Sequence, residues 1–144
     1  MEWFVSAQAN IPVAQLQREI RADNLAVWCA LPPAMAVLLD TPAGSDWAAS
    51  GVHRELIRDG LRFSVPGAHA ALQWTLTAGG QQRAGTVALH CSVNVAAPDA
   101  ASVAAVNEFM QAWRVGLEAG VQRLQEQRDL KAAAASAPCA PWFG

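Results

Sequence analysis

The chain has 144 residues and a mass of 15.2 kDa, which is the size of a single domain. Hydrophobic residues make up 53% of it and charged residues 15%, which excludes disordered and collagen-like chains. The formal net charge is −2 and no basic cluster is present, so we expect no nucleic-acid partner. The sequence therefore predicts one globular domain of near-neutral charge.

The cysteines, the first residues and the uncharged stretches bear on the cellular compartment. Three cysteines without a C-x-x-C spacing indicate neither a disulfide framework nor a zinc site, and a reducing cytoplasm fits them best. The first residues carry no basic segment, so we expect no signal peptide. The uncharged stretch from Asn24 to Leu39 is broken by two prolines, so we expect no membrane span. Nine arginines to one lysine, with about a fifth alanine, are typical of a GC-rich bacterial source.

The N-terminal region predicts one strand and two short helices. Apolar and polar residues alternate over residues 3–11, which is the pattern of a strand. Pro12 suits the first turn of a short amphipathic helix that ends near Ile20. Asp23 and Asn24 cap a second short helix, which the prolines at 32 and 33 prevent from continuing.

The middle of the chain predicts an antiparallel meander, beginning with brief extended runs from Met35. Residues 52–57 and 61–65 read as a hairpin, because Asp59 and Gly60 tolerate the positive φ of a type I′ turn. Alternation then predicts strands over residues 72–77 and 86–95, and the second places His90 on the polar face. Counted with the first strand and the run near Met35, the prediction is six strands.

A long amphipathic helix follows Asp99. Its apolar residues recur at steps of three and four, which predicts roughly 30 residues and a length of about 45 Å; they are Val103, Val106, Met110, Trp113, Leu117, Val121 and Leu124. Residues 132–144 are rich in alanine and proline and are predicted to form a flexible tail. The domain prediction is therefore 1–131 with a tail over 132–144.

Three segments carry a resemblance to a known superfamily. They are the segment from Ser6 to Pro12 that enters the first helix, the segment from Asp23 to Trp28, in which Asp is followed five residues later by Trp, and the helical segment from Phe109 to Leu117. With this order of elements, residues 3–130 resemble the polyketide cyclase/START-like superfamily, also called SRPBCC. The resemblance implies an α+β helix-grip fold, with a curved antiparallel sheet wrapped around the long C-terminal helix.

The resemblance also implies an apolar cavity between sheet and helix that holds a small hydrophobic molecule. We count six strands where seven are common, and the stretch from Trp28 to Gly51 is short for the superfamily. No catalytic signature of a cyclase, dehydratase or lyase is present, so no activity follows from the resemblance.

Apolar residues on the strands and on the long helix are the candidate ligand-binding set. They are Phe63, Trp74, Leu89, Cys91, Phe109, Met110, Trp113 and Leu117. Trp74 and Trp113 are placed to stack on an aromatic ligand, while the filling of an ordinary packed core is the leading alternative for them. Cys91 reads as a small buried hydrophobe and not as a nucleophile.

A second candidate set lies at the expected cavity mouth. His53, Arg54 and Glu55, with Asp46, form the one charged group predicted near it, and a solvated strand edge is the alternative. The sequence thus predicts a binder of a small hydrophobic or aromatic molecule, without cofactor or metal. Two alternatives stay open: a cyclase- or dehydratase-type enzyme using these charged residues, and an interaction module or homodimer using the long helix or the tail.

Overall fold

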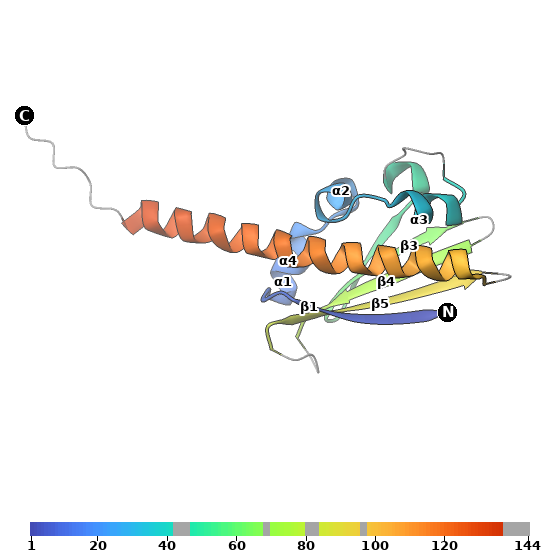
Figure 1. The fold of residues 1–144 in the computed structure, drawn as a ribbon. Coiled ribbons are helices and arrows are strands. Elements are labelled where there is room, and N and C mark those ends of the chain that lie inside the picture. The colour runs from blue at the N-terminus through green and yellow to red at the C-terminus, as the bar shows by residue number, and fades with distance from the viewer. Residues whose placement is uncertain (42–46, 68–69, 80–83, 96–97, 137–144) are drawn as a thin grey trace, which may run out of the picture.

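The computed structural model describes residues 1–41, 47–67, 70–79, 84–95 and 98–136. The chain forms an α+β domain in which an antiparallel sheet is paired with a long C-terminal helix (Figure 1). The elements are β1 (Glu2–Gln8), α1 (Val13–Glu19), η1 (Ala22–Asn24), α2 (Leu25–Trp28), α3 (Pro33–Leu38), η2 (Trp47–Ser50), β2 (His53–Ile57), β3 (Gly60–Pro66), β4 (Ala70–Thr77), β5 (Thr86–Val95) and α4 (Ala100–Ser136).

The sheet has five described strands in the order β1-β5-β4-β3-β2, all antiparallel, and it is curved and unclosed. The cleanest alternation in the sequence becomes β5, the long strand to which both β1 and β4 are paired. Its odd-numbered residues from Val87 to Val93 are buried, while His90 faces the other way, as predicted. The predicted helix-grip arrangement of a curved sheet and a long helix is confirmed.

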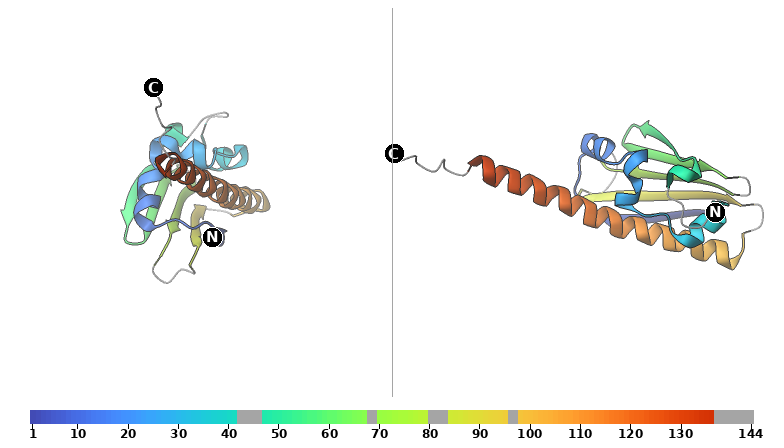
Figure 2. Two further views of the ribbon diagram at one scale, coloured as in Figure 1. Left: turned by 90° about the vertical axis from the view of Figure 1, so that its left-hand side faces the viewer. Right: turned by 90° about the horizontal axis from the view of Figure 1, so that it is seen from above.

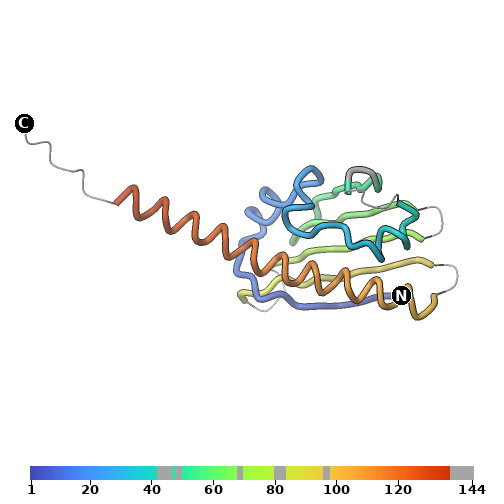
Figure 3. The backbone as a smooth tube through the Cα atoms, turned by 45° about the horizontal axis from the view of Figure 1, so that its top comes forward, coloured from blue at the N-terminus to red at the C-terminus, as the bar shows by residue number. Residues whose placement is uncertain are grey.

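All the helices lie on one face of the sheet, and the other face is left open (Figure 2). α4 packs mainly against β1, and the two run side by side (Figure 3). α2 and α3 pack against α4, and α1 packs against β3. The core therefore lies in one layer, between the sheet on one side and the helices on the other.

Two side chains fasten α1 to the far edge of the sheet. The amide of Gln17 donates to the backbone oxygens of Ile57 (3.0 Å) and Gly60 (3.1 Å). The guanidinium of Arg54 donates to the backbone oxygens of Gln17 and Ile20 at the carboxyl end of α1. A seven-residue helix has little stability alone, so these bonds and its buried face hold it in place.

The structure corrects two predictions in the middle of the chain. The run near Met35 is not extended: Pro33 starts the helix α3, so the described strands number five and not six. Proline has a φ already suited to the first helical turn, which explains why a helix opens at Pro33.

The hairpin turn is the second correction. Ile57 pairs with Gly60, so the turn residues are Arg58 and Asp59, and Gly60 is not among the described glycines with positive φ. A Cβ at Gly60 would lie 1.8 Å from the backbone oxygen of Leu76. The glycine serves the close approach of β4 and not the type I′ turn that was predicted.

α4 is longer than predicted. It has 37 residues, about 55 Å, and ends at Ser136, five residues beyond Lys131. The added residues include four consecutive alanines, the residue with the highest helix propensity. Residues 137–144 of the predicted tail lie outside the described residues.

Candidate functional site

The eight candidate ligand-binding residues come together in the layer between the sheet and α4. Each of them is at most 1% exposed. Phe63, Trp74, Leu89 and Cys91 come from β3, β4 and β5, while Phe109, Met110, Trp113 and Leu117 come from α4. The sequence prediction thus assembled residues that are neighbours in space.

Strand register places the sheet residues side by side. Phe63 pairs with Trp74 across β3 and β4, and Trp74 pairs with Cys91 across β4 and β5. Directly opposed residues of antiparallel strands share a face with Cβ atoms about 5 Å apart. Phe63 and Trp74 stack with ring centroids 5.2 Å apart. These three side chains form a continuous apolar row beneath α4.

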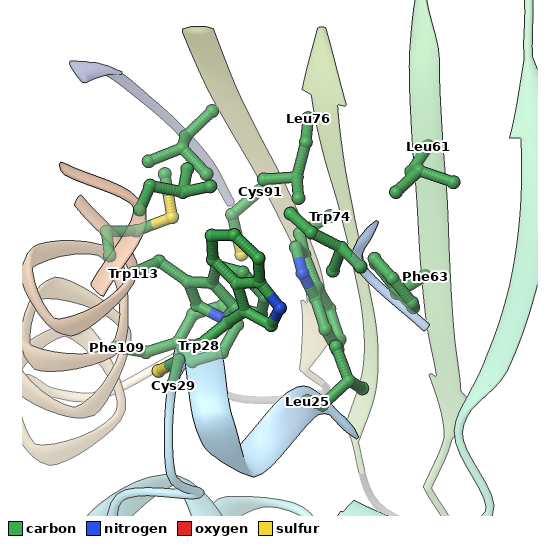
Figure 4. Packing of buried hydrophobic residues seen from close by; sticks show 14 of the residues in the cluster. Leu25, Trp28, Cys29, Leu61, Phe63, Trp74, Leu76, Cys91, Phe109 and Trp113 are labelled. Carbon is green, nitrogen blue, oxygen red and sulfur yellow. The ribbon is translucent and has the colours of Figure 1, made fainter. Parts of the chain in front are cut away.

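The helix supplies the opposite wall. Phe109, Met110, Trp113 and Leu117 recur at helical spacing and face the sheet. The ring of Trp74 lies 5.3 Å from that of Phe109, edge to face, and 5.9 Å from that of Trp113 (Figure 4). Trp74 is therefore in contact with aromatic rings from both layers.

A third wall comes from Trp47, which the sequence reasoning missed. Trp47 sits on η2, a four-residue 3₁₀ helix, yet it is 2% exposed. Its ring lies 5.1 Å from Trp74 and 5.9 Å from Phe109, and its Nε1 donates to the backbone oxygen of Cys29 at 2.7 Å. No periodicity surrounds this residue. The only signal in the sequence was the presence of six tryptophans in a chain without tyrosine.

Two indole N–H groups in this interior find no acceptor among the described residues. They are Nε1 of Trp74 and Nε1 of Trp113. By contrast, the Nε1 atoms of Trp28 and Trp47 donate to the backbone oxygens of Glu19 (3.3 Å) and Cys29 (2.7 Å). A buried donor without a partner costs about 1–3 kcal/mol, so the pair stands out in an otherwise satisfied core.

The interior carries no charge. Among the described residues, the buried polar ones are Thr86 and Ser102, and none is ionisable. Burial raises the pKa of the Cys29 and Cys91 thiols from 9.0 to about 12, since the thiolate loses its hydration. The prediction that Cys91 is a buried hydrophobe is confirmed.

The three residues of the predicted cavity mouth do not share a face. Arg54 is opposite Phe63 in the register and turns its guanidinium to the backbone of α1. His53 and Glu55 are exposed on the open face of the sheet, where Glu55 pairs with Arg62 at 3.3 Å. Asp46 lies outside the described residues. The structure therefore shows no joint contact of these residues with the aromatic interior.

Grooves formed by the described residues open at the surface. One of about 290 Å³ lies at an end of the open face, between polar side chains that include His53, Ser64 and Gln73. Another of about 640 Å³ lies between α1 and the last turns of α4. None of the eight interior residues lines these two grooves, and none lines two further grooves of about 260 Å³ each. A ligand in the interior would have to displace a side chain that fills it.

The described residues include neither a membrane-spanning helix nor a metal-binding cluster. No helix there is both long and apolar enough to cross a membrane. No three His, Cys, Asp or Glu side chains gather there as a metal would require. Comparison of the chain with protein-family models, with curated proteins and with solved structures finds no match.

Proposed function

We propose that the protein binds a small hydrophobic or aromatic molecule between the sheet and α4. The observation that carries the proposal is the position of Trp47. Its bicyclic ring packs on Trp74 and Phe109 much as a flat ligand would, yet it comes from a short 3₁₀ helix and not from the sheet or α4. This ring can therefore move out without breaking a strand pairing.

In such an exchange the ligand replaces the apolar burial that Trp47 gives up. An aromatic group of this size buries about 150–250 Å², which at roughly 25 cal/mol per Å² contributes about 4–6 kcal/mol before the costs of binding. The one hydrogen bond of the Trp47 side chain, to the Cys29 backbone, is worth about 1 kcal/mol. A ligand that restores the ring contacts offsets most of the loss when Trp47 leaves.

Membership of the polyketide cyclase/START-like superfamily and a cytoplasmic location belong to this proposal. The first rests on the three sequence segments described above and on a sheet and helix arranged as in that superfamily. The second rests on three cysteines without a C-x-x-C spacing. No contact between described residues favours the enzyme alternative, since His53 and Glu55 face away from the interior. We therefore propose binding and not catalysis.

The test uses the purified full chain. Native mass spectrometry looks for a co-purified small molecule, and titration with tetralin, a bicyclic hydrocarbon, is followed by tryptophan fluorescence. We expect saturable binding to the wild type and at least tenfold tighter binding to Trp47→Ala, because the competing ring is gone. Phe4→Ala removes a ring that is 74% exposed on the open face, and serves as the control.

The outcomes separate clearly. Binding to the wild type that Phe4→Ala leaves unchanged supports the proposal. Binding to Trp47→Ala alone would reveal only the cavity made by truncation and would overturn it. Absence of binding to both proteins would overturn it as well.

A second candidate, self-association, is favoured by the end of α4. Every residue from Glu126 to Ser136 is exposed, and Leu130 is 71% exposed. This part of the helix projects beyond the sheet (Figure 1). We propose a second copy as the partner, because this segment carries both signs of charge and so complements itself better than a strongly acidic or basic partner. Its charged residues are Glu126, Arg128, Asp129 and Lys131.

Light scattering over a range of concentrations tests this candidate. We expect a dimer that Leu130→Asp weakens at least tenfold and that Val37→Asp, at an 80% exposed site on α3, leaves intact. A monomer at all concentrations, or equal effects of the two substitutions, would exclude the arrangement.

A further inference from the structure

The two unpaired indole donors face the same layer from opposite walls. Trp74 belongs to the sheet and Trp113 to α4, and both nitrogens lie between the two elements (Figure 4). Trp74 is 1% exposed and Trp113 is fully buried, so bulk water does not reach them. Donors at two matching positions indicate an acceptor that the described residues do not supply.

The two indole rings that carry the unpaired donors are direct neighbours in the core. Their centroids are 5.9 Å apart and their planes are inclined by 48°. Two N–H···O bonds of about 2.9 Å that meet at one oxygen span at most about 5.8 Å between nitrogens. A carbonyl oxygen has two lone pairs and accepts two such bonds. One carbonyl oxygen that lies within about 2.9 Å of both Nε1 atoms would satisfy both donors.

The surroundings favour a neutral acceptor over an anionic one. No buried residue in the described part of the chain is charged. The nearest cation along the sheet row is Arg54, whose guanidinium already serves the backbone of α1. A buried carboxylate without a cation costs far more than two hydrogen bonds return.

We infer that the ligand is a neutral bicyclic or similarly flat apolar molecule with a carbonyl group, whose oxygen accepts hydrogen bonds from Nε1 of Trp74 and Nε1 of Trp113. This inference rests on the proposed function and adds the chemical class of the ligand. Ketones, lactones, esters and quinones fit the class, while free carboxylic acids do not.

The experiment compares three probes of nearly equal size by titration of the full chain. Tetralin has no acceptor, 1-tetralone adds one ketone oxygen, and tetrahydro-1-naphthoate carries a charge. We expect the wild type to bind 1-tetralone at least tenfold more tightly than the other two probes, because the ketone pairs two donors that tetralin leaves unpaired. Trp74→Phe and Trp113→Phe keep an aromatic ring and remove the N–H, so each should lose most of this preference.

Trp28→Phe is the matched control, because its N–H already donates to Glu19 and its loss should leave the preference intact. Indole ¹⁵N–¹H spectra give a second readout that does not depend on the variants folding: 1-tetralone should move the Trp74 and Trp113 resonances and leave that of Trp28 in place.

Each contrary result has one meaning. Failure of every probe to bind overturns the proposed function. Equal binding of tetralin and 1-tetralone overturns the present inference and leaves the function standing, as does a ketone preference that survives both Trp→Phe changes. Tight binding of the carboxylate overturns the neutral class. Magnetisation transfer from a bound water to both indoles, unchanged by 1-tetralone, shows that water is the acceptor and also overturns the inference.

Discussion

Burial sets the acid–base chemistry of the two described cysteines. Cys29 and Cys91 lie in the apolar interior, and burial raises the pKa of each thiol to about 12. In the unfolded chain each thiol titrates near 9.0. Above pH 9 the unfolded state therefore loses protons that the folded state retains, so stability falls as the pH rises.

We predict a fall in unfolding free energy of about 1.4 kcal/mol per pH unit for each buried thiol between pH 9 and pH 12. Few other side chains titrate in this pH range, because the chain has no tyrosine and its one lysine is Lys131. Urea unfolding at pH 8 and pH 10.5 measures the slope, with Cys139→Ser as the background. Replacing Cys29 and Cys91 by alanine should flatten it, and an unchanged slope in that double variant would contradict this account.

At the scale of elements, the crossing of α2 over α4 depends on two glycines. A Cβ at Gly116 would lie 1.8 Å from the backbone oxygen of Trp28, and a Cβ at Gly120 would lie 2.3 Å from the Trp28 ring. Glycine in the middle of a helix costs about 1 kcal/mol relative to alanine, so its presence twice, four residues apart, requires a packing reason. Close approach of the two helices is that reason.

We predict that Gly116→Ala and Gly120→Ala each lower the unfolding free energy by about 1–3 kcal/mol, although alanine is the better helix former. Gln122→Ala, at an exposed position of the same helix, should change it by less than about 0.5 kcal/mol. Urea unfolding gives the values. For Gly120, a double variant with Trp28→Leu should recover part of the loss, and strictly additive losses would show that the ring contact is not the cause.

At the scale of the whole molecule, α4 belongs to two environments. Its first part packs on β1, β5, α2 and α3, and its last buried residue is Val121. Beyond Gln125 the helix projects past the sheet (Figures 1 and 3), and every residue from Glu126 to Ser136 is exposed. Two bonds, Gln125 to the Asn10 oxygen and Arg128 to Gln15, tether its base. Beyond Arg128, tertiary packing no longer supports the helix.

We predict two regimes of hydrogen exchange along this one helix. Amides from Ser102 to Val121 open only with the core, while amides from Asp129 to Ser136 should exchange at least a hundredfold faster, because an unpacked helical end frays. Exchange measured by NMR or mass spectrometry at low protein concentration provides the test. Uniform protection at low concentration would contradict the prediction, and protection that grows with concentration would identify the second copy proposed above.

The sequence by itself determined the elements whose signal is periodic. Alternation in residues 86–95 and the steps of three and four from Val103 to Leu124 reflect burial of one face, which local spacing records. The burial of Trp113 followed from the helical steps and that of Trp74 from the alternation over residues 72–77, while the helix-grip fold was what the resemblance implied. These predictions succeeded because strand and helix each repeat within a few residues.

Only the tertiary structure decided the rest. Trp47 enters the core from a segment without a pattern, and Pro33 starts a helix where an extended run was predicted. Whether an indole N–H finds an acceptor, as for Trp28, or finds none among the described residues, as for Trp74 and Trp113, depends on backbone oxygens far away in the chain. Local sequence records which face of an element is buried. Contacts between distant segments are fixed only by tertiary packing, and this packing also decides which buried N–H groups have no acceptor.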